Sequence, residues 1–344
     1  MVTPVFWSKL WQRHQSFALE LAKLGYTIFY LQPLKSGGLS IEVVKKSING
    51  LDINIITCNV PFKATSQPSL NNISAKFALF LLKKKLNINF SESVLWLSEP
   101  SLSYFTKCKW AKIIYDKCDL HGTFPGQKKW IWNRYENEIF NHCNLCLCSH
   151  EYILNDIPEY INALVVKNAV TEDFKSIKPK QRKKDKVLKL VSCGAHYEWI
   201  DFNWLFSFLK QDNTELHIVG TGRGKDFEQL LKTENVIFHG QIEHNELPDL
   251  LQDFDVGLVP FKDIELIKGV DPIKIYEYAS LGLKIWAPDI KCLYSNTLID
   301  DFVKFEGCNR IIISNKNKKN SFIPTWKNRI FTLKDLIMVN KKYD

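Results

Sequence analysis

The sequence has no run of about 18 apolar residues, so no segment is long enough to cross a bilayer as a helix. Its first residues also lack the order of a signal peptide, in which a charged stretch precedes an apolar one. We therefore expect a cytoplasmic protein. The nine cysteines are an odd number, and several lie within apolar segments, which favours reduced, buried thiols over a disulfide framework.

The spaced cysteine and histidine pairs of a metal site are missing as well. The densest group, residues 142–148, reads His-Cys-Asn-Leu-Cys-Leu-Cys. In a strand Cys146 and Cys148 would share one face, and no second pair completes a tetrahedral site. The glycine-rich turn 220–224 departs from the dinucleotide fingerprint, because Lys225 stands where a glycine is required. We expect neither a metal nor a cofactor.

The formal net charge of +9 favours anionic partners such as nucleotides, phospholipid head groups or nucleic acid. Part of the excess lies in residues 175–186, which we interpret as a solvated linker. Because this run contains no interleaved aromatic residues, nucleic-acid binding is not expected. Residues 75–86 are apolar over two turns and then basic. They are compatible with a helix on an anionic membrane surface, or with a packed helix whose lysines complement its dipole.

Helical and strand patterns alternate along the chain, which implies parallel sheets. A helix at 15–24 leads through Gly25 to a strand at 27–31. Further strands are predicted at 53–57, 94–97, 111–115, 145–148 and 164–166, and after the linker at 188–192, 215–219, 236–239, 256–259 and 283–286.

A chain of 344 residues is long enough for two cores. We predict an α/β fold with two Rossmann-like domains, at 1–174 and 187–320, joined by the linker 175–186. A C-terminal helix is expected within 321–344. Ligands of such sheets sit beyond the carboxyl ends of the strands, so functional residues are expected in strand-end loops.

The segment from Val270 to Pro288 indicates a capped helix that leads into a strand. We predict Asp271 as N-cap, Pro272 as the first helical residue and Gly282 as the left-handed stop. Lys274 would then lie in the first turn, beside free backbone N–H groups and the positive end of the helix dipole, where phosphate binds readily. Glu277 would share its face. An ordinary surface Lys–Glu pair is the alternative interpretation.

This proline-led helix, with its lysine, glutamate and small-residue turn, resembles the donor-binding helix of GT-B glycosyltransferases of group 1. The resemblance is closest to bacterial enzymes of surface-polysaccharide and teichuronic-acid-type synthesis, and it continues at Arg13-His14-Gln15, 115–119, 168–170, 193–195, 219–222, 239–242, 247–248 and 255–261.

The resemblance implies two domains that face each other across a cleft, with the terminal helix crossing back to the first. It also implies that Lys274 contacts the nucleotide diphosphate and Glu277 the ribose. The remaining residues expected at the donor are Gly194, Ile242 and Ile273. Arg223, in the glycine-rich turn 220–224, is a further candidate for a phosphate contact, with an exposed arginine on a structural turn as the alternative.

Two features of the family are absent from the sequence. Many retaining members carry a second glutamate eight positions before Glu277, and Gly269 stands there. The paired arginine and lysine that often follow the first strand of the second domain are missing from 193–199. The stereochemistry of transfer is therefore open.

The expected activity is transfer of a sugar from a nucleoside-diphosphate donor to the hydroxyl of a saccharide or a lipid-linked saccharide. Lys274 and the helix N-terminus would stabilise the leaving diphosphate without a metal. An inverting route needs a base; we choose Asp119, with Asp116 and His121 as alternates. An aspartate that only caps turns in its loop is the alternative interpretation of Asp119. A retaining route needs no base. A sugar-nucleotide epimerase of the same fold and a non-catalytic nucleotide-sugar-binding protein are the alternatives.

Overall fold

The computed structural model describes residues 1–86, 88–177, 187–319 and 322–338, so most of the predicted linker lies outside it. The chain divides into two compact units. Unit 1 comprises Met1–Lys167, Gly269–Asp271 and Lys327–Asp344; unit 2 comprises Asn168–Lys268 and Pro272–Trp326. Residues 168–174, which we assigned to the first domain, thus group with unit 2. The segment from Lys327 onward groups with unit 1.

Unit 1 contains two sheets. The first has the order β1-β4-β2, with β3 paired antiparallel to β4; the second, β5-β6-β7-β8, is parallel throughout. Val2 forms isolated parallel bridges to Leu97 and Leu31 and so joins the two sheets. The strands are β1 (Ile28–Leu31), β2 (Lys35–Ser36), β3 (Ser40–Ile48), β4 (Leu51–Val60), β5 (Val94–Leu97), β6 (Lys112–Lys117), β7 (Leu145–Cys148) and β8 (Ala163–Val165).

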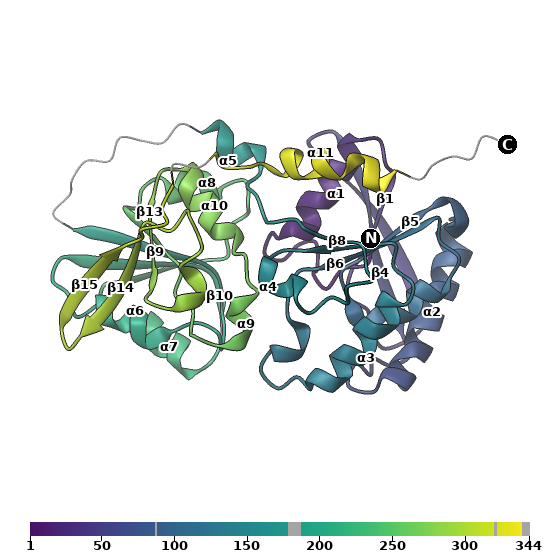
Figure 1. Ribbon diagram of the computed structural model, residues 1–344, viewed down its shortest axis with the longest axis horizontal. Helices are drawn as coiled ribbons and strands as arrows, with labels where there is room; N and C mark the ends of the chain where they lie inside the picture. Colours follow the sequence, from purple (N-terminus) through teal and green to yellow (C-terminus); the bar gives the residue numbers. More distant parts are fainter. Residues whose placement is uncertain (87, 178–186, 320–321, 339–344) are drawn as a thin grey trace. The chain divides into compact units, whose positions relative to one another are not determined.

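The helices of unit 1 include two that lie side by side, α2 and α3 (Figure 1). None of the helices in the described part of the chain combines the length and apolar character needed to span a membrane. The last helix ends against β6, where Lys112 Nζ donates to the carbonyl oxygens of Leu336 (2.7 Å) and Met338 (3.0 Å). The helices are α1 (Arg13–Lys23), α2 (Pro68–Leu86), α3 (Lys129–Phe140), α4 (Glu151–Leu154) and α11 (Trp326–Ile337), the last beginning at the final residue of unit 2.

Unit 2 is built on one seven-stranded sheet of order β11-β10-β9-β12-β13-β14-β15, in which only β14 and β15 are antiparallel neighbours. Its strands are β9 (Leu188–His196), β10 (Thr214–Gly222), β11 (Val236–Gly240), β12 (Val256–Leu258), β13 (Lys284–Pro288), β14 (Asp301–Glu306) and β15 (Asn309–Ser314). Its helices are α5 (Glu172–Ser176), α6 (Phe202–Phe208), α7 (Lys225–Leu231), α8 (Leu247–Leu251), α9 (Glu265–Lys268) and α10 (Ile273–Ser280).

Every predicted strand is present, with its ends shifted by a few residues at most. The buried thiols of Cys146 and Cys148 were predicted correctly, and their burial in β7 raises the pKa of both. Two hairpins were missed, β3–β4 and β14–β15. Neither β3 nor β15 has a fully buried residue, and the alternation of exposed and half-buried residues in β3 ends at Val44, so both give only a weak strand signal.

Candidate functional site

Helix α10 begins one residue later than predicted. Pro272, with an extended backbone (φ −75°, ψ 124°), is the N-cap, and Asp271 lies outside the helix. The prediction of Asp271 as N-cap was therefore wrong. Ile273 becomes the first helical residue and Lys274 the second. The end of the helix is as predicted: Gly282 has φ +70°, and Leu283 N–H donates to the Tyr278 carbonyl at 3.0 Å.

Lys274 reaches from α10 to the end of β9. A Cβ placed on Gly194 would lie 3.4 Å from its Nζ, and the same nitrogen lies 5.5 Å from the ring centroid of Phe261. Burial lowers the pKa of this ammonium, partly countered by Cys193 and Glu277. Within the described residues no carboxylate forms an ion pair with Lys274. The nearby Glu277 is paired with His244 instead. A desolvated ammonium in this setting is stabilised most by an anion.

Two glycines allow β9 and β10 to approach each other closely beside Lys274. Gly194 and Gly220 are register partners on β9 and β10, and both have positive φ, +119° and +114°. A Cβ on Gly220 would lie 2.1 Å from the Gly194 carbonyl oxygen. Tyr278 fixes the helix over these strands, because its hydroxyl accepts a hydrogen bond from Cys193 N–H at 2.9 Å. Lys274 is therefore held at the carboxyl end of the sheet, where ligands of such folds bind.

Glu277 is nearly buried and contacts a residue that sequence reasoning missed. Its Oε1 lies 3.1 Å from Nε2 of His244, which belongs to the loop after β11. The sequence signal for His244 was its position between 239–242 and 247–248, two of the segments that carry the family resemblance. Gly194, Lys274 and Glu277 are thus brought together as the donor hypothesis requires.

The other three donor candidates are less tightly placed. Arg223 follows β10, but its side chain is 66% exposed and pairs with Glu198, Nη2 to Oε1 at 3.0 Å. Its guanidinium also lies 4.7 Å from the ring centroid of Tyr197. Ile242 and Ile273 are both half-buried, Ile242 just after β11 and Ile273 at the start of α10. Their role at the donor stays a prediction.

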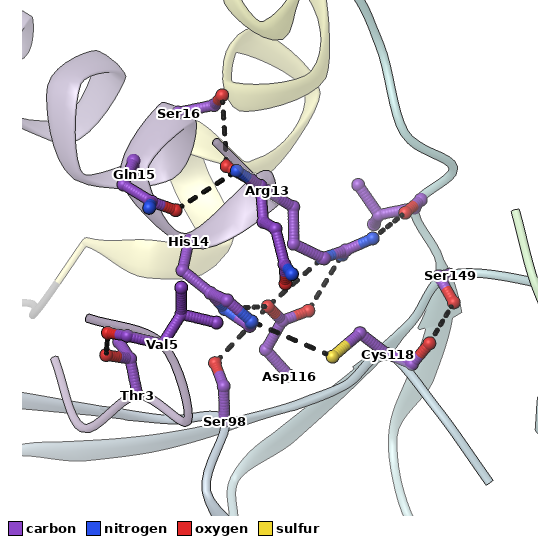
Figure 2. A network of polar contacts seen from close by, with 12 residues as sticks. Thr3, Val5, Arg13, His14, Gln15, Ser16, Ser98, Asp116, Cys118 and Ser149 are labelled. Carbon is purple, nitrogen blue, oxygen red and sulfur yellow. Dashed lines mark hydrogen bonds and ion pairs between the residues drawn. The ribbon is translucent and has the colours of Figure 1, made fainter. Parts of the chain in front are cut away.

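In unit 1, Asp116 is fully buried and bound to Arg13 of α1 (Figure 2). Arg13 Nη2 lies 2.7 Å from Oδ1 and its Nε 3.2 Å from Oδ2, while Nη1 donates to the Val166 carbonyl at 3.1 Å. Ser98 Oγ donates to Oδ2 as well, at 3.4 Å. These contacts tie α1 to β6 and to the end of β8. They use both oxygens of Asp116, which makes it the weaker candidate for a base.

The next residue on β6, Lys117, points to the opposite face and contacts Glu136 of α3. Tyr115 donates to the same Glu136 oxygen at 2.8 Å. His121 Nδ1 lies 3.5 Å from it, and Trp132 stacks on the imidazole with 5.4 Å between centroids. Burial alone would raise the pKa of Glu136, but His121 and Lys117 outweigh it and lower this pKa to about 2.

Asp119 lies just beyond β6, half-buried, between these two networks. Burial raises its pKa, against the opposing effects of His121, the Cys118 thiol, Arg13 and Lys117. A carboxylate with a raised pKa binds a proton more readily, which is what a general base requires. Asp119 as the base, with Asp116 and His121 as alternates, stays a prediction.

Among the described residues, no group of three or more histidine, cysteine, aspartate or glutamate side chains is arranged to hold a metal ion. The polar groups around Lys274 instead suit an anion. His196 lies near Lys274, and burial together with that ammonium lowers the pKa of His196 to about 3, so its imidazole is neutral.

The arrangement of the sheets and helices defines the fold class: this chain has the GT-B fold of glycosyltransferases, as predicted. A solved sucrose-phosphate synthase from Thermosynechococcus elongatus matches with a TM-score of 0.60 and 12% identity, over 82% of this chain and 76% of that one. A structure described as trehalose-6-phosphate from E. coli bound with UDP-2-fluoro glucose matches with a TM-score of 0.56 and 11% identity, over 85% and 84%.

One curated relative is similar in sequence. It is TuaH of Bacillus subtilis (strain 168), whose name describes a glycosyltransferase of teichuronic acid biosynthesis. The two are 22% identical over 218 residues, 56% of this chain, and the match spans about half of TuaH, 55% of its length. No family model matches the sequence.

Proposed function

We propose that this protein is a glycosyltransferase that moves a sugar from a nucleoside-diphosphate donor to an acceptor hydroxyl. One observation carries the proposal: the desolvated ammonium of Lys274, at the N-terminal turn of α10 and against Gly194, has no carboxylate partner among the described residues. The GT-B fold and the name of the relative support the same assignment.

In the proposed reaction the bond between the sugar's anomeric carbon and the diphosphate oxygen breaks, and a bond to the acceptor oxygen forms. The departing diphosphate gains negative charge. Lys274 and the N–H groups of the first turn of α10 stabilise this charge as fixed positive groups, so no metal is required. In an inverting reaction the acceptor's proton passes to the carboxylate of Asp119, whose raised pKa suits that task.

The acceptor in this proposal is a saccharide, free or lipid-linked, and the protein acts at the inner face of a membrane. Helix α2 supports membrane contact: Phe80 (57% exposed) and Ile73 (41%) lie on the surface near the exposed Lys76 and the run 83–85. The neighbouring helix α3 begins with Lys129 and Trp130, which is 61% exposed. Helix α2 contains no acidic residue. Each lysine close to an anionic bilayer contributes about 1 kcal/mol to the free energy of membrane binding.

The activity is tested first by thermal shift with UDP-, GDP-, TDP- and CMP-sugars. A ligand present at about 100 times its Kd stabilises the folded state by about 2.7 kcal/mol, so one donor should raise the Tm. A transfer assay with that donor follows. A changed sugar nucleotide formed without any acceptor would indicate an epimerase instead. Donor that stays intact with all acceptors would indicate a binding protein.

Membrane contact is tested by sedimentation with vesicles. We expect binding to phosphatidylglycerol-containing vesicles but not to pure phosphatidylcholine, and a clear loss of binding for the double variant Phe80→Ala, Trp130→Ala. Tyr160→Ala is the matched control, since Tyr160 is 73% exposed and lies outside α2 and α3. An equal loss of vesicle binding in the control, or binding that does not depend on lipid charge, would contradict membrane contact through α2 and α3.

A further inference from the structure

The carboxylate expected to bind the donor's ribose does not stand alone. Glu277 Oε1 lies 3.1 Å from His244 Nε2, and both side chains are nearly buried, 9% and 12% exposed. The two residues are 33 positions apart and come from α10 and from the loop between β11 and α8. A hydrogen bond shielded from water in this way is stronger than an exposed one.

The imidazole of His244 is fixed on a second side. It packs against Phe174 of α5, with 5.2 Å between ring centroids and a 44° angle between planes. Phe174 is fully buried, and α5 lies against α10. His244 thus has little freedom to rotate, and its Nε2 stays directed at Glu277. For Nε2 to donate this hydrogen bond it must carry a proton.

The fixed imidazole of His244 determines the orientation of the Glu277 carboxylate. Each carboxylate oxygen can accept about two hydrogen bonds, so the contact at Oε1 leaves Glu277 able to accept from the vicinal hydroxyls of a ribose. Holding the carboxyl plane before the ligand arrives removes part of the ordering cost of binding. A site built to bond a hydroxyl also discriminates strongly against a ligand that lacks it.

We propose that His244 is a positioning residue that orients Glu277 and thereby makes the site selective for ribonucleotides over nucleotides that lack the vicinal ribose hydroxyls. This inference rests on the proposed function, because it assigns the ribose of the donor to Glu277. His244 itself touches neither the sugar nor the diphosphate in this scheme; its effect passes through the carboxylate. Phe174 contributes by holding the ring.

The test compares two substitutions of similar size. His244→Leu keeps a side chain against Phe174 but cannot donate, whereas His244→Gln retains an N–H donor. Calorimetry with UDP and its 2′,3′-dideoxy form, and with GDP and its dideoxy form, measures Kd for each protein. His239→Leu is the matched control, because His239 bonds His217 at 2.9 Å, in the same unit, and not Glu277.

We expect wild-type protein to prefer the ribonucleotide at least tenfold. His244→Leu should weaken ribonucleotide binding about tenfold, equivalent to about 1.4 kcal/mol, and leave the dideoxy Kd unchanged. His244→Gln should recover most of the preference, and His239→Leu should keep it. Equal weakening of both nucleotides, or an unchanged preference in His244→Leu, would overturn the role of His244. Wild-type protein that binds no nucleoside diphosphate would overturn the proposed function itself.

Discussion

Replacing Lys274 by methionine should have different effects on ligand affinity and on the stability of the fold. The ammonium is desolvated by the fold, and this burial lowers its pKa, which means that the folded protein bears a cost for keeping the charge there. Methionine fills a similar volume without needing solvation. In the absence of ligand we therefore expect Lys274→Met to unfold at the same temperature as the wild type, or at a higher one.

The Lys274→Met variant should bind its ligand more weakly, although its stability is unchanged or higher. A hydrogen bond to a charged group contributes about 1.5–3 kcal/mol, and each 1.4 kcal/mol is a factor of ten. The Kd for a nucleoside diphosphate should therefore rise between about 10- and 150-fold. Turnover should fall at least as far, because the charge that Lys274 meets increases as the diphosphate departs.

The assay is calorimetry with the donor found by thermal shift, together with unfolding in urea without ligand. Lys232→Met is the matched control, since Lys232 is exposed at the end of α7 in the same unit. It should leave both quantities unchanged. If Lys274→Met binds the diphosphate as tightly as wild type, Lys274 does not hold the anion and the reasoning fails.

Three further predictions follow from particular contacts. Asp119→Asn should abolish transfer while changing the donor Kd less than about twofold, because an amide cannot accept the acceptor's proton; transfer at the wild-type rate would exclude this base. Burial lowers the pKa of His14 to about 4 and that of His196 to about 3. The unfolded chain then binds more protons below the ordinary value of about 6.5, so stability is full above that pH and declines as pH falls toward 4, by on the order of 3 kcal/mol for His14 alone; equal urea midpoints at pH 7 and pH 4.5 would contradict it. Gly220→Ala should destabilise unit 2 by at least about 2 kcal/mol, because its Cβ would meet the Gly194 carbonyl. Gly224→Ala, also at positive φ but with no atom within 4 Å of the added Cβ, should cost only about 1 kcal/mol.

The buried strands could be predicted from the sequence because burial on both faces leaves a short apolar run. The strand at 145–148 has its predicted ends in the structure. The hairpin β3–β4 was missed although Asn49-Gly50, with φ of +50° and +77°, is a typical hairpin turn. Its outer strand, β3, is mostly exposed, and its apolar alternation covers only the first five residues. Helix α10 was recognised, but its start was misplaced by one residue because aspartate is usually the better N-cap.

Spacing alone predicts neighbours in the candidate site only where the residues are close in sequence; Gly194 was named through the family resemblance. Lys274 and Glu277 lie on one helix, and their spacing alone suggests a shared face. Their neighbours could not be found in this way. His244 is 33 residues from Glu277, and Arg13 is 103 residues from Asp116. From the sequence alone Asp116, at a strand end, is a candidate base. The fold pairs it with Arg13, which makes that role less favourable.

The central claim is that Lys274 and the first turn of α10 bind the diphosphate of an activated sugar. A crystal structure with UDP or GDP, whichever binds more tightly, tests it most directly. We predict a phosphate oxygen within about 3 Å of Lys274 Nζ, with the ribose hydroxyls at Glu277. A nucleotide bound elsewhere, with Lys274 contacting only solvent, would contradict the claim.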